Sequence, residues 1–187
     1  KNHTVCSLEM EFLHGGLPQM ELTASWQKPA HPEPDIKPAG DYNDTLLKIL
    51  GAWNVCSKEW VIRQYDHEVQ GASVLKPLVG EKEDGPGDAA IIKPVPTSRC
   101  GLVISNGINT RYGDVDPYWM AASSIDEALR QVIAVGGSLE KAALLDNFCW
   151  GSVKDKQSLG ALVKASQACH DMSLEYKTPF ISGKDSL

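Results

Sequence analysis

The sequence lacks several features that would assign it to a familiar class. Its five cysteines form no CxxC pair, so the sequence indicates neither a zinc knuckle nor a disulfide framework. No apolar run approaches the roughly 18 residues that a membrane helix requires, and the chain does not open with a charged and then apolar leader. We therefore expect a cytoplasmic protein that does not enter a membrane.

The chain also has no excess of basic residues. Its 18 lysines and arginines are outnumbered by 24 aspartates and glutamates, which gives a formal net charge of -6. Because attraction to nucleic-acid phosphates depends on clustered positive charge, we do not expect DNA or RNA as a partner. The 187 residues, 42% of them hydrophobic, are enough to bury one sizeable core.

The N-terminal part differs in composition from the rest. Residues 4–12 and 20–26 are short apolar-rich runs joined by a Gly-Gly-Leu-Pro loop, which predicts a β-hairpin. Residues 28–40 carry four prolines among charged residues, which is typical of a linker. We therefore divide the chain into residues 1–40, a hairpin and linker that end a preceding domain, and a compact domain over residues 41–187. The polar last residues and the strand-like start lead us to expect a piece of a longer protein.

The second part alternates strand-like and helix-like segments, which predicts an α/β fold. The expected strands cover residues 88–93, 101–105, 142–145 and 179–182. The expected helices cover residues 44–53, 117–135 and 156–176. In the middle helix Asp116 can cap the amide groups, Pro117 suits the first turn, and Gly136 allows a left-handed exit. In the last helix we expect one buried stripe, formed by Leu159, Leu162, Val163, Ser166, Cys169 and Tyr176.

Two places in this pattern could hold a hard cation. Glu127 and Gln131 are four residues apart on the helix over residues 117–135, so their oxygen atoms project from one face. Asp88 follows a Gly-Pro-Gly turn and precedes a buried strand, where a carboxylate can hold Mg²⁺ beside phosphates. The alternatives are a solvated helix face for the pair and, for Asp88, a turn residue that satisfies its own backbone.

Two further places could contact phosphate. Asp146 and Asn147 follow the expected strand over residues 142–145, at the end where α/β proteins gather ligands. The segment Ser-Gly-Lys-Asp-Ser-Leu over residues 182–187 combines glycine, a cation and hydroxyls, as phosphate loops do, but it lacks the P-loop spacing. For residues 65–71, Tyr-Asp-His-Glu-Val-Gln-Gly, a structural role with ion pairing at a domain edge competes with metal or acid–base chemistry.

Five strings together resemble one family, phosphoribosylformylglycinamidine synthase. They are YDHEVQG (65–71), GDAA (87–90), GDVDPYWMAA (113–122), LLDNFCWG (144–151) and SGKDSL (182–187). The resemblance covers about residues 43–187 and implies the N-terminal domain of an aminoimidazole-ribonucleotide-synthetase-like half, the third of four such domains. It implies a β-sheet packed on helices that pairs with its counterpart into a shared barrel.

The resemblance also implies a reaction and its participants. In this family, formylglycinamide ribonucleotide is activated with ATP, and ammonia from a glutaminase domain or subunit then displaces phosphate to give the amidine. Asp146 and Gly183 resemble ATP-binding positions, and Ser186 resembles a substrate-binding hydroxyl. Lys184 stands where shorter members place a metal-binding Asn, so it could instead pair with phosphate. Asp88, Glu127 and Gln131 resemble the Mg²⁺ ligands of an auxiliary nucleotide.

The family's catalytic histidine and glutaminase cysteine lie outside the matched region. We therefore expect no catalytic residue in this chain, no turnover by the chain alone, and a need for the remaining domains of the same synthase. Self-association through an exposed apolar surface is also expected. Two other readings stay open: a non-catalytic module that holds a structural ADP and mediates pseudo-dimer assembly, and another ATPase of the same superfamily.

Overall fold

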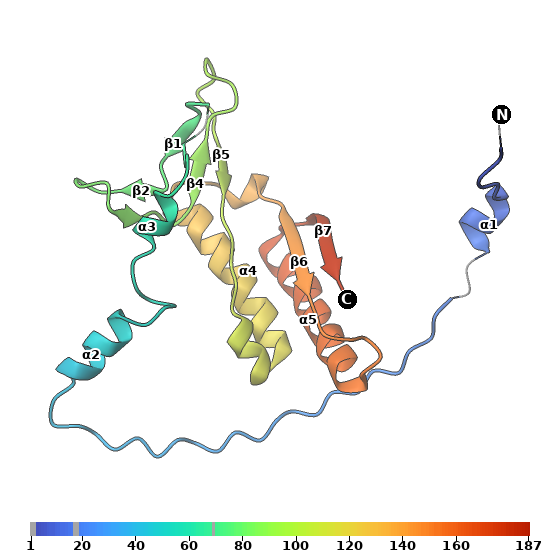
Figure 1. Ribbon diagram of the computed structural model, residues 1–187, viewed down its shortest axis with the longest axis horizontal. Coiled ribbons are helices and arrows are strands. Elements are labelled where there is room, and N and C mark those ends of the chain that lie inside the picture. Colours follow the sequence, from blue (N-terminus) through green and yellow to red (C-terminus); the bar gives the residue numbers. More distant parts are fainter. Residues whose placement is uncertain (1–2, 17–18, 69) are drawn as a thin grey trace.

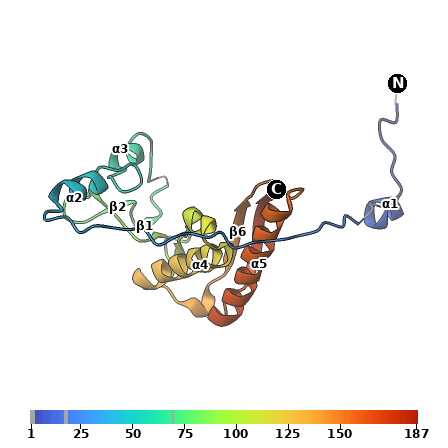
Figure 2. The same ribbon diagram turned by 90° about the horizontal axis from the view of Figure 1, so that it is seen from below.

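The computed structural model describes residues 3–16, 19–68 and 70–187 (Figure 1). Its centre is formed by two long helices, α4 (Pro117–Ala134) and α5 (Lys156–Tyr176), which pack side by side. A three-stranded antiparallel sheet in the order β1-β4-β5 lies at one side, and the parallel pair β6–β7 lies at the other (Figures 1 and 2). This arrangement confirms the predicted mixed α/β fold.

The short strands and helices surround this centre. The strands are β1 (Ser73–Leu75), β2 (Leu78–Val79), β3 (Gly85–Pro86), β4 (Ala90–Ile92), β5 (Leu102–Ile104), β6 (Leu144–Cys149) and β7 (Phe180–Ser186). The remaining helices are α1 (Met10–Gly15), α2 (Asn43–Leu50) and α3 (Glu59–Ile62), with the 3-10 turns η1 (Thr110–Asp114) and η2 (Leu139–Lys141). In the described part of the chain, no helix is both long and apolar enough to cross a membrane.

The core lies where α4 meets α5 and β6. Its alanines, two from each helix, are Ala121, Ala122, Ala165 and Ala168. A second cluster joins Ile125 and Leu129 of α4 to Leu144 of β6. Small side chains at the contact allow the two helix backbones to approach closely, so each alanine methyl sits in a tightly packed layer. Ala165 and Ala168 are fully buried.

Helix α4 begins and ends as the sequence predicts. The Asp116 carboxylate accepts a hydrogen bond of 2.9 Å from the amide of Tyr118, and Pro117 occupies the first turn. Gly136 leaves the helix with φ of 85°, a left-handed conformation that glycine adopts without steric cost. These end signals are local, which is why the sequence was enough to find them.

The predicted stripe on α5 is partly wrong. The helix runs over the expected residues, but its buried positions are Gly160, Ala165 and Ala168, whereas Val163 and Ser166 are exposed. The apolar periodicity favoured the larger residues. At Ala165 and Ala168 the close approach of α4 instead selects small side chains, because a bulky residue there would separate the helices, whereas Gly160 is covered by residues 25 and 26.

The N-terminal hairpin prediction is wrong for the described residues. Residues 10–15 form the short helix α1, and residues 3–9 and 19–27 have no strand partner; residues 17 and 18 of the expected loop lie outside the described part. A two-stranded hairpin without a third strand or a packed face is only marginally stable. The proline-rich segment 28–40 has no helix or strand, as predicted. The domain boundary at residue 41 stays a prediction.

The expected phosphate loop at the C-terminus is also different in the structure. Residues 183–186 continue strand β7, and β6 extends through Asn147 to Cys149, so the polar residues lie within strands. The two strands pair in parallel over their whole length and thereby satisfy each other's backbone groups. That pairing is between residues about 36 apart in sequence, and local composition does not reveal it.

Replacing Ala168 by leucine tests the close packing of α4 on α5. We expect Ala168→Leu to lower the free energy of unfolding by about 1–3 kcal/mol, because a buried alanine with no free space around it cannot accommodate three more carbons. Denaturant unfolding followed by circular dichroism measures the change. Ser166→Leu, two residues away on the exposed side of the same helix, is the control and should shift stability far less. Equal effects in both variants would contradict the packing described above.

Candidate functional site

The parallel pair β6–β7 brings together four residues that the sequence singled out. Asp146 is the register partner of Gly183, Asn147 faces Lys184, and Cys149 faces Ser186. Helix α5 lies between the two strands in the sequence, so β6, α5 and β7 form a β-α-β unit. In such units the carboxyl ends of the strands are the usual place for ligands.

The side chains on this pair are divided between its two faces, because successive residues of a strand point to opposite sides. Asp146 is half-buried and lies on the face that packs on the helices. Its carboxylate fills the space beside Gly183, where a β-carbon would overlap it. Gly183 is therefore required by the position of Asp146. Lys184 and Ser186 share the opposite face, and the Lys184 ammonium donates a hydrogen bond to the Ser186 hydroxyl.

The charge of the Asp146 carboxylate affects the pKa of the Cys169 thiol. Burial between α5 and its neighbours, and to a smaller degree the nearby Asp146 carboxylate, together raise the pKa of the Cys169 thiol to about 11. Both effects disfavour the thiolate, which is the reactive form. Cys169 is therefore a packed thiol that stays protonated at neutral pH.

A second polar group lies between α4 and the loop that follows β5. Glu127 Oε2 accepts hydrogen bonds of 3.0 Å from the Ile108 amide and from Asn109 Nδ2. The side chain of Gln131 accepts a longer one, 3.4 Å, from the Asn106 amide. The predicted pair thus projects from one helix face, as expected, and fastens this loop to α4. Oε2 carries both bonds, which leaves Oε1 of Glu127 as the oxygen that could take a cation.

Gly107 explains why this loop can lie so close to the helix. A β-carbon at this position would overlap the backbone oxygen of Ser124 in α4. Two residues before it, Ser105 Oγ donates a hydrogen bond of 2.8 Å to the Ala128 oxygen. The loop is therefore held by backbone and side-chain bonds on both sides of a glycine that permits the contact.

Asp88 lies on a different element from the Glu127 and Gln131 pair. It occupies the bend between β3 and β4 and is exposed to solvent. Within the described residues, no group of three or more histidine, cysteine, aspartate and glutamate side chains is placed to hold a metal ion. The assignment of Asp88, Glu127 and Gln131 to one cation site stays a prediction.

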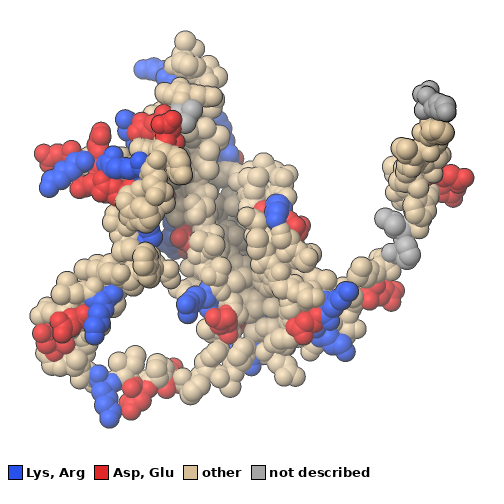
Figure 3. Space-filling view, viewed as in Figure 1, with Lys and Arg blue, Asp and Glu red and all other residues tan. Residues whose placement is uncertain are grey.

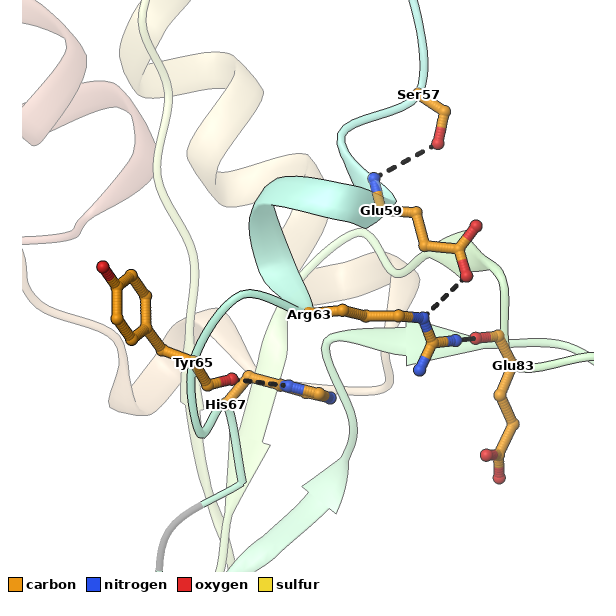
Figure 4. A network of polar contacts seen from close by, with 6 residues as sticks. All are labelled: Ser57, Glu59, Arg63, Tyr65, His67 and Glu83. Carbon is orange, nitrogen blue, oxygen red and sulfur yellow. Dashed lines mark hydrogen bonds and ion pairs between the residues drawn. The ribbon is translucent and has the colours of Figure 1, made fainter.

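The loop over residues 65–71 has a structural environment in the part that the structure describes; Val69 lies outside it. Glu68 forms an ion pair of 3.1 Å with Lys76, and this contact raises the pKa of the lysine. His67 Nδ1 lies 3.3 Å from the backbone oxygen of Tyr65 (Figure 4). These contacts favour the interpretation of this loop as an ion-paired edge.

Arg63 ties the neighbouring segments together. Its guanidinium donates to the Glu59 carboxylate at 2.7 Å and to the Glu83 backbone oxygen at 2.6 Å (Figure 4). Helix α3 is thereby joined to the turn between β2 and β3. The network is exposed and joins short elements, so it holds local geometry more than it adds stability.

The sequence reasoning missed two residues that the structure adds to these places. Asn109 bonds Glu127, and it sits in a loop whose composition carried no site signal. The outward face of β6–β7 also includes Cys149 beside Ser186. Neither contact could be read from spacing, because the first depends on a loop folding back on α4 and the second on strand register.

Comparison with known proteins identifies the class to which this fold and these strands belong. Residues 86–187 match the family model of the AIR synthase related protein, N-terminal domain. Since this match covers more than half of the chain, the chain belongs to that family.

The chain is also similar to curated proteins over most or all of its length. It is 30% identical to the phosphoribosylformylglycinamidine synthase subunit PurL of Picrophilus torridus over 100% of the chain and 25% of that protein. It is 34% identical to PurL of Methanocaldococcus jannaschii over 81% of the chain and 19% of that protein. PurL of Rhodopseudomonas palustris matches with 30% identity over 99% of the chain and 26% of its own length. The chain thus spans about a quarter of these relatives, which contain further regions.

The environment of Cys169 yields a test of the position of Asp146. We expect Asp146→Asn to lower the pKa of Cys169 from about 11, but only in part, because burial is the larger cause of the shift. Folded-state thiol alkylation between pH 8 and pH 10, read by mass spectrometry at each cysteine, measures this as faster labelling of Cys169. Asp155→Asn, which removes a carboxylate at the start of α5, is the control. Unchanged labelling of Cys169 in Asp146→Asn would show that the carboxylate does not face the thiol.

The raised pKa of Cys169 also makes the stability of the protein depend on pH. A raised folded-state pKa means that the protonated thiol stabilises the fold fully below its ordinary pKa of 9.0. This contribution is lost as the pH rises through about 11. Cys169→Ala, which cannot ionise, should therefore show a weaker loss of stability between these pH values.

Proposed function

We propose that this chain is the nucleotide-contacting part of a phosphoribosylformylglycinamidine synthase. The whole enzyme would convert formylglycinamide ribonucleotide to the amidine with ATP and with ammonia from glutamine. The observation that carries the proposal is the β6–β7 pair, which has Asp146 and Gly183 on one face and Lys184 and Ser186 on the other, in a chain similar to PurL along its whole length. Purine biosynthesis is the role that follows.

The chemistry of the pair fits a phosphorylated ligand. Lys184 carries three donors and a positive charge, and Ser186 offers a hydroxyl on the same face. A phosphate oxygen could replace the hydroxyl as the acceptor of the lysine's hydrogen bond, which would place ammonium and hydroxyl on one phosphoryl group. We assign Lys184 to phosphate and Ser186 to the substrate or its phosphate.

Asp146 and Gly183 are assigned to ATP. The Asp146 carboxylate occupies the space beside the Gly183 backbone that a β-carbon would fill, so a ligand of this carboxylate would also lie close to Gly183. The carboxylate suits Mg²⁺, which typically takes one or two protein carboxylates and completes its shell with phosphates and water. When bound, the ion would neutralise charge on the phosphates. The chain's own groups would orient the nucleotide.

One observation favours a second candidate function, a module that holds a structural ADP. Glu127 and Gln131 lie on α4 with the loop after β5, whereas Asp146 and Lys184 lie on β6–β7. These are different elements, so they offer two separate places for a ligand. In this reading Glu127 Oε1 and Gln131, with Asp88, would contact Mg²⁺ at an auxiliary nucleotide, and the domain would serve assembly.

The exposed surface supports a partner within a larger protein. The chain exposes 15212 Å², whereas a folded monomer of its mass exposes about 8,800 Å². Part of the excess belongs to the extended N-terminal segment. The rest includes large apolar side chains, and we assign this surface to the remaining domains of the synthase, with a glutaminase as the source of ammonia.

One such surface is the outer face of the sheet β1-β4-β5. Val103 points toward α4, since it would contact a β-carbon at Gly137 near the helix end. Its neighbours Leu102 and Ile104 therefore point away, and each is about half exposed. Figure 3 shows charges crowded at the β2–β3 end and mostly uncharged surface over the centre of the molecule. We propose that the outer sheet face packs against a counterpart sheet.

Magnesium-dependent nucleotide binding tests the first assignment. We expect ATP to bind this chain more tightly with Mg²⁺ than without it, and Asp146→Asn to remove that difference, because the variant keeps the shape but loses the charge that holds the ion. Isothermal titration of ATP and ADP measures both constants. Asp84→Asn, in the exposed turn between β2 and β3, is the matched control.

The pattern of loss separates the two candidate functions. Loss in Asp146→Asn and in Lys184→Met supports the site on β6–β7. Loss only in Asp88→Asn and Glu127→Gln supports the auxiliary site. An Asp146→Asn variant that binds MgATP like the unmodified chain, while Asp84→Asn also binds normally, would refute the assignment of Asp146.

Self-association tests the outer sheet face. We expect the isolated chain to form dimers or larger species at high concentration and Ile104→Asp to reduce them, because a charge on this face prevents its burial. Sedimentation velocity over a concentration series measures the effect. Leu174→Asp, at an exposed apolar residue of α5, is the control. A strictly monomeric unmodified chain would count against this assignment.

A further inference from the structure

The N-terminal segment touches the folded part of the protein at one tightly bonded place. Among the described residues before Cys56, every side chain is exposed except that of Trp26, which is half-buried. The segment runs in an extended conformation past the start of α5 and continues toward α2 (Figures 1 and 2). Residues 24–27 are therefore the place where this segment packs against the folded part of the protein.

The contact begins with three backbone-directed hydrogen bonds. The Ser25 amide donates to the Lys156 oxygen at 2.9 Å. Gln157 then bonds the Gln27 backbone twice: its Oε1 accepts from the Gln27 amide, and its Nε2 donates to the Gln27 oxygen, both at 3.0 Å. The side-chain amide of Gln157 thereby takes the place of a strand partner. Backbone bonds of this kind hold an extended segment without regard to most of its side chains.

Gly160 makes this contact possible. A β-carbon at residue 160 would lie 2.5 Å from the Ser25 carbonyl carbon and 2.7 Å from the Trp26 nitrogen. A helical side chain covers the turn that precedes it, so any residue larger than glycine would also shield the Lys156 oxygen four residues earlier. Glycine inside a helix is less favourable than alanine, because it loses more conformational freedom on folding. Its place in the second turn of α5 is explained by the segment that packs on it.

The Trp26 side chain provides a further contact between the segment and α5. The Lys164 ammonium lies 4.5 Å from the centre of the Trp26 ring, within the range of a cation–π interaction. A shallow hollow lies between the segment and α5, lined by Ala24, Ser25 and Trp26 on one side and by Gly160, Val163, Lys164 and Gln167 on the other. Lys164 and Gly160 are one turn apart, so ring and backbone meet the same face of α5.

A second point of attachment follows a few residues later. His31 Nε2 lies 2.9 Å from the backbone oxygen of Asp114, in the turn η1 directly before α4. A carbonyl oxygen only accepts, so this ring nitrogen is the donor. The segment is thus fastened first to the start of α5 and then to the start of α4, and it bridges the two helices that form the core.

We propose that residues 24–31 form a clasp, a docking segment that fastens the N-terminal part of the chain to the amino-terminal ends of α4 and α5. Trp26 is its anchor, Gln157 its backbone partner, and Gly160 the residue that admits it. The proline-rich composition of residues 28–40 keeps the following segment extended, so the clasp also sets where that segment starts. The clasp uses none of the residues assigned to nucleotide, and it stands or falls independently of the proposed function.

Amide hydrogen exchange of the full 187-residue chain, read by NMR at single residues, tests the clasp. We expect the Ser25 and Gln27 amides to be protected in the unmodified chain and to lose that protection in Gly160→Ala. The same substitution improves the helix propensity of α5, so amides such as those of Cys169 and Met172 should stay protected or become more so. Ser166→Ala, on the exposed face of α5, is the control and should leave Ser25 and Gln27 protected.

Trp26→Ala supplies a second variant that leaves α5 unchanged. We expect it to release the Ser25 and Gln27 amides as well, while the α5 amides keep their protection. The clasp is refuted if these two amides exchange in the unmodified chain as fast as in an unstructured peptide. It is equally refuted if they stay protected in Gly160→Ala or in Trp26→Ala while α5 remains folded.

Discussion

The close packing of α4 on α5 is the contact on which the other features depend. Four alanines form the centre of the interface, and the Tyr176 hydroxyl adds a hydrogen bond of 2.6 Å to Asp126 across it. Asp126 also pairs with Arg130, and both partners hold the pKa of this carboxyl below its usual range. With the helices locked together, α4 presents Glu127 to the loop after β5, and α5 supports the β6–β7 pair.

Glycines lie at three close contacts around this helical centre. Gly107 admits the loop after β5 to α4, Gly183 leaves room for the Asp146 carboxylate, and Gly160 admits the clasp to α5. In each case a β-carbon would overlap an atom of the neighbouring segment. The candidate ligand residues and the clasp therefore both depend on a glycine at a contact that is too close for any side chain.

The candidate site could be predicted in part. Asp146, Gly183, Lys184 and Ser186 were selected from sequence, and the structure places them on adjacent strands. What the sequence missed is their division between two faces, since strand register and alternation determine it. Glu127 and Gln131 were correctly placed on one helix face, but their bonds to the loop after β5 come from long-range folding. Asp88 lies on another element, and its grouping with them rests on resemblance.

The sequence by itself determined the local features: the two long helices, the cap at Asp116, the left-handed exit at Gly136 and the absence of regular structure in residues 28–40. Each depends on contacts within a few residues. The tertiary structure decided which face of α5 is buried, that polar residues 183–186 form a strand, and that residues 3–27 form no hairpin in their described part. These outcomes depend on partners far away in the chain, because burial and strand pairing are properties of two surfaces that meet and not of either segment alone.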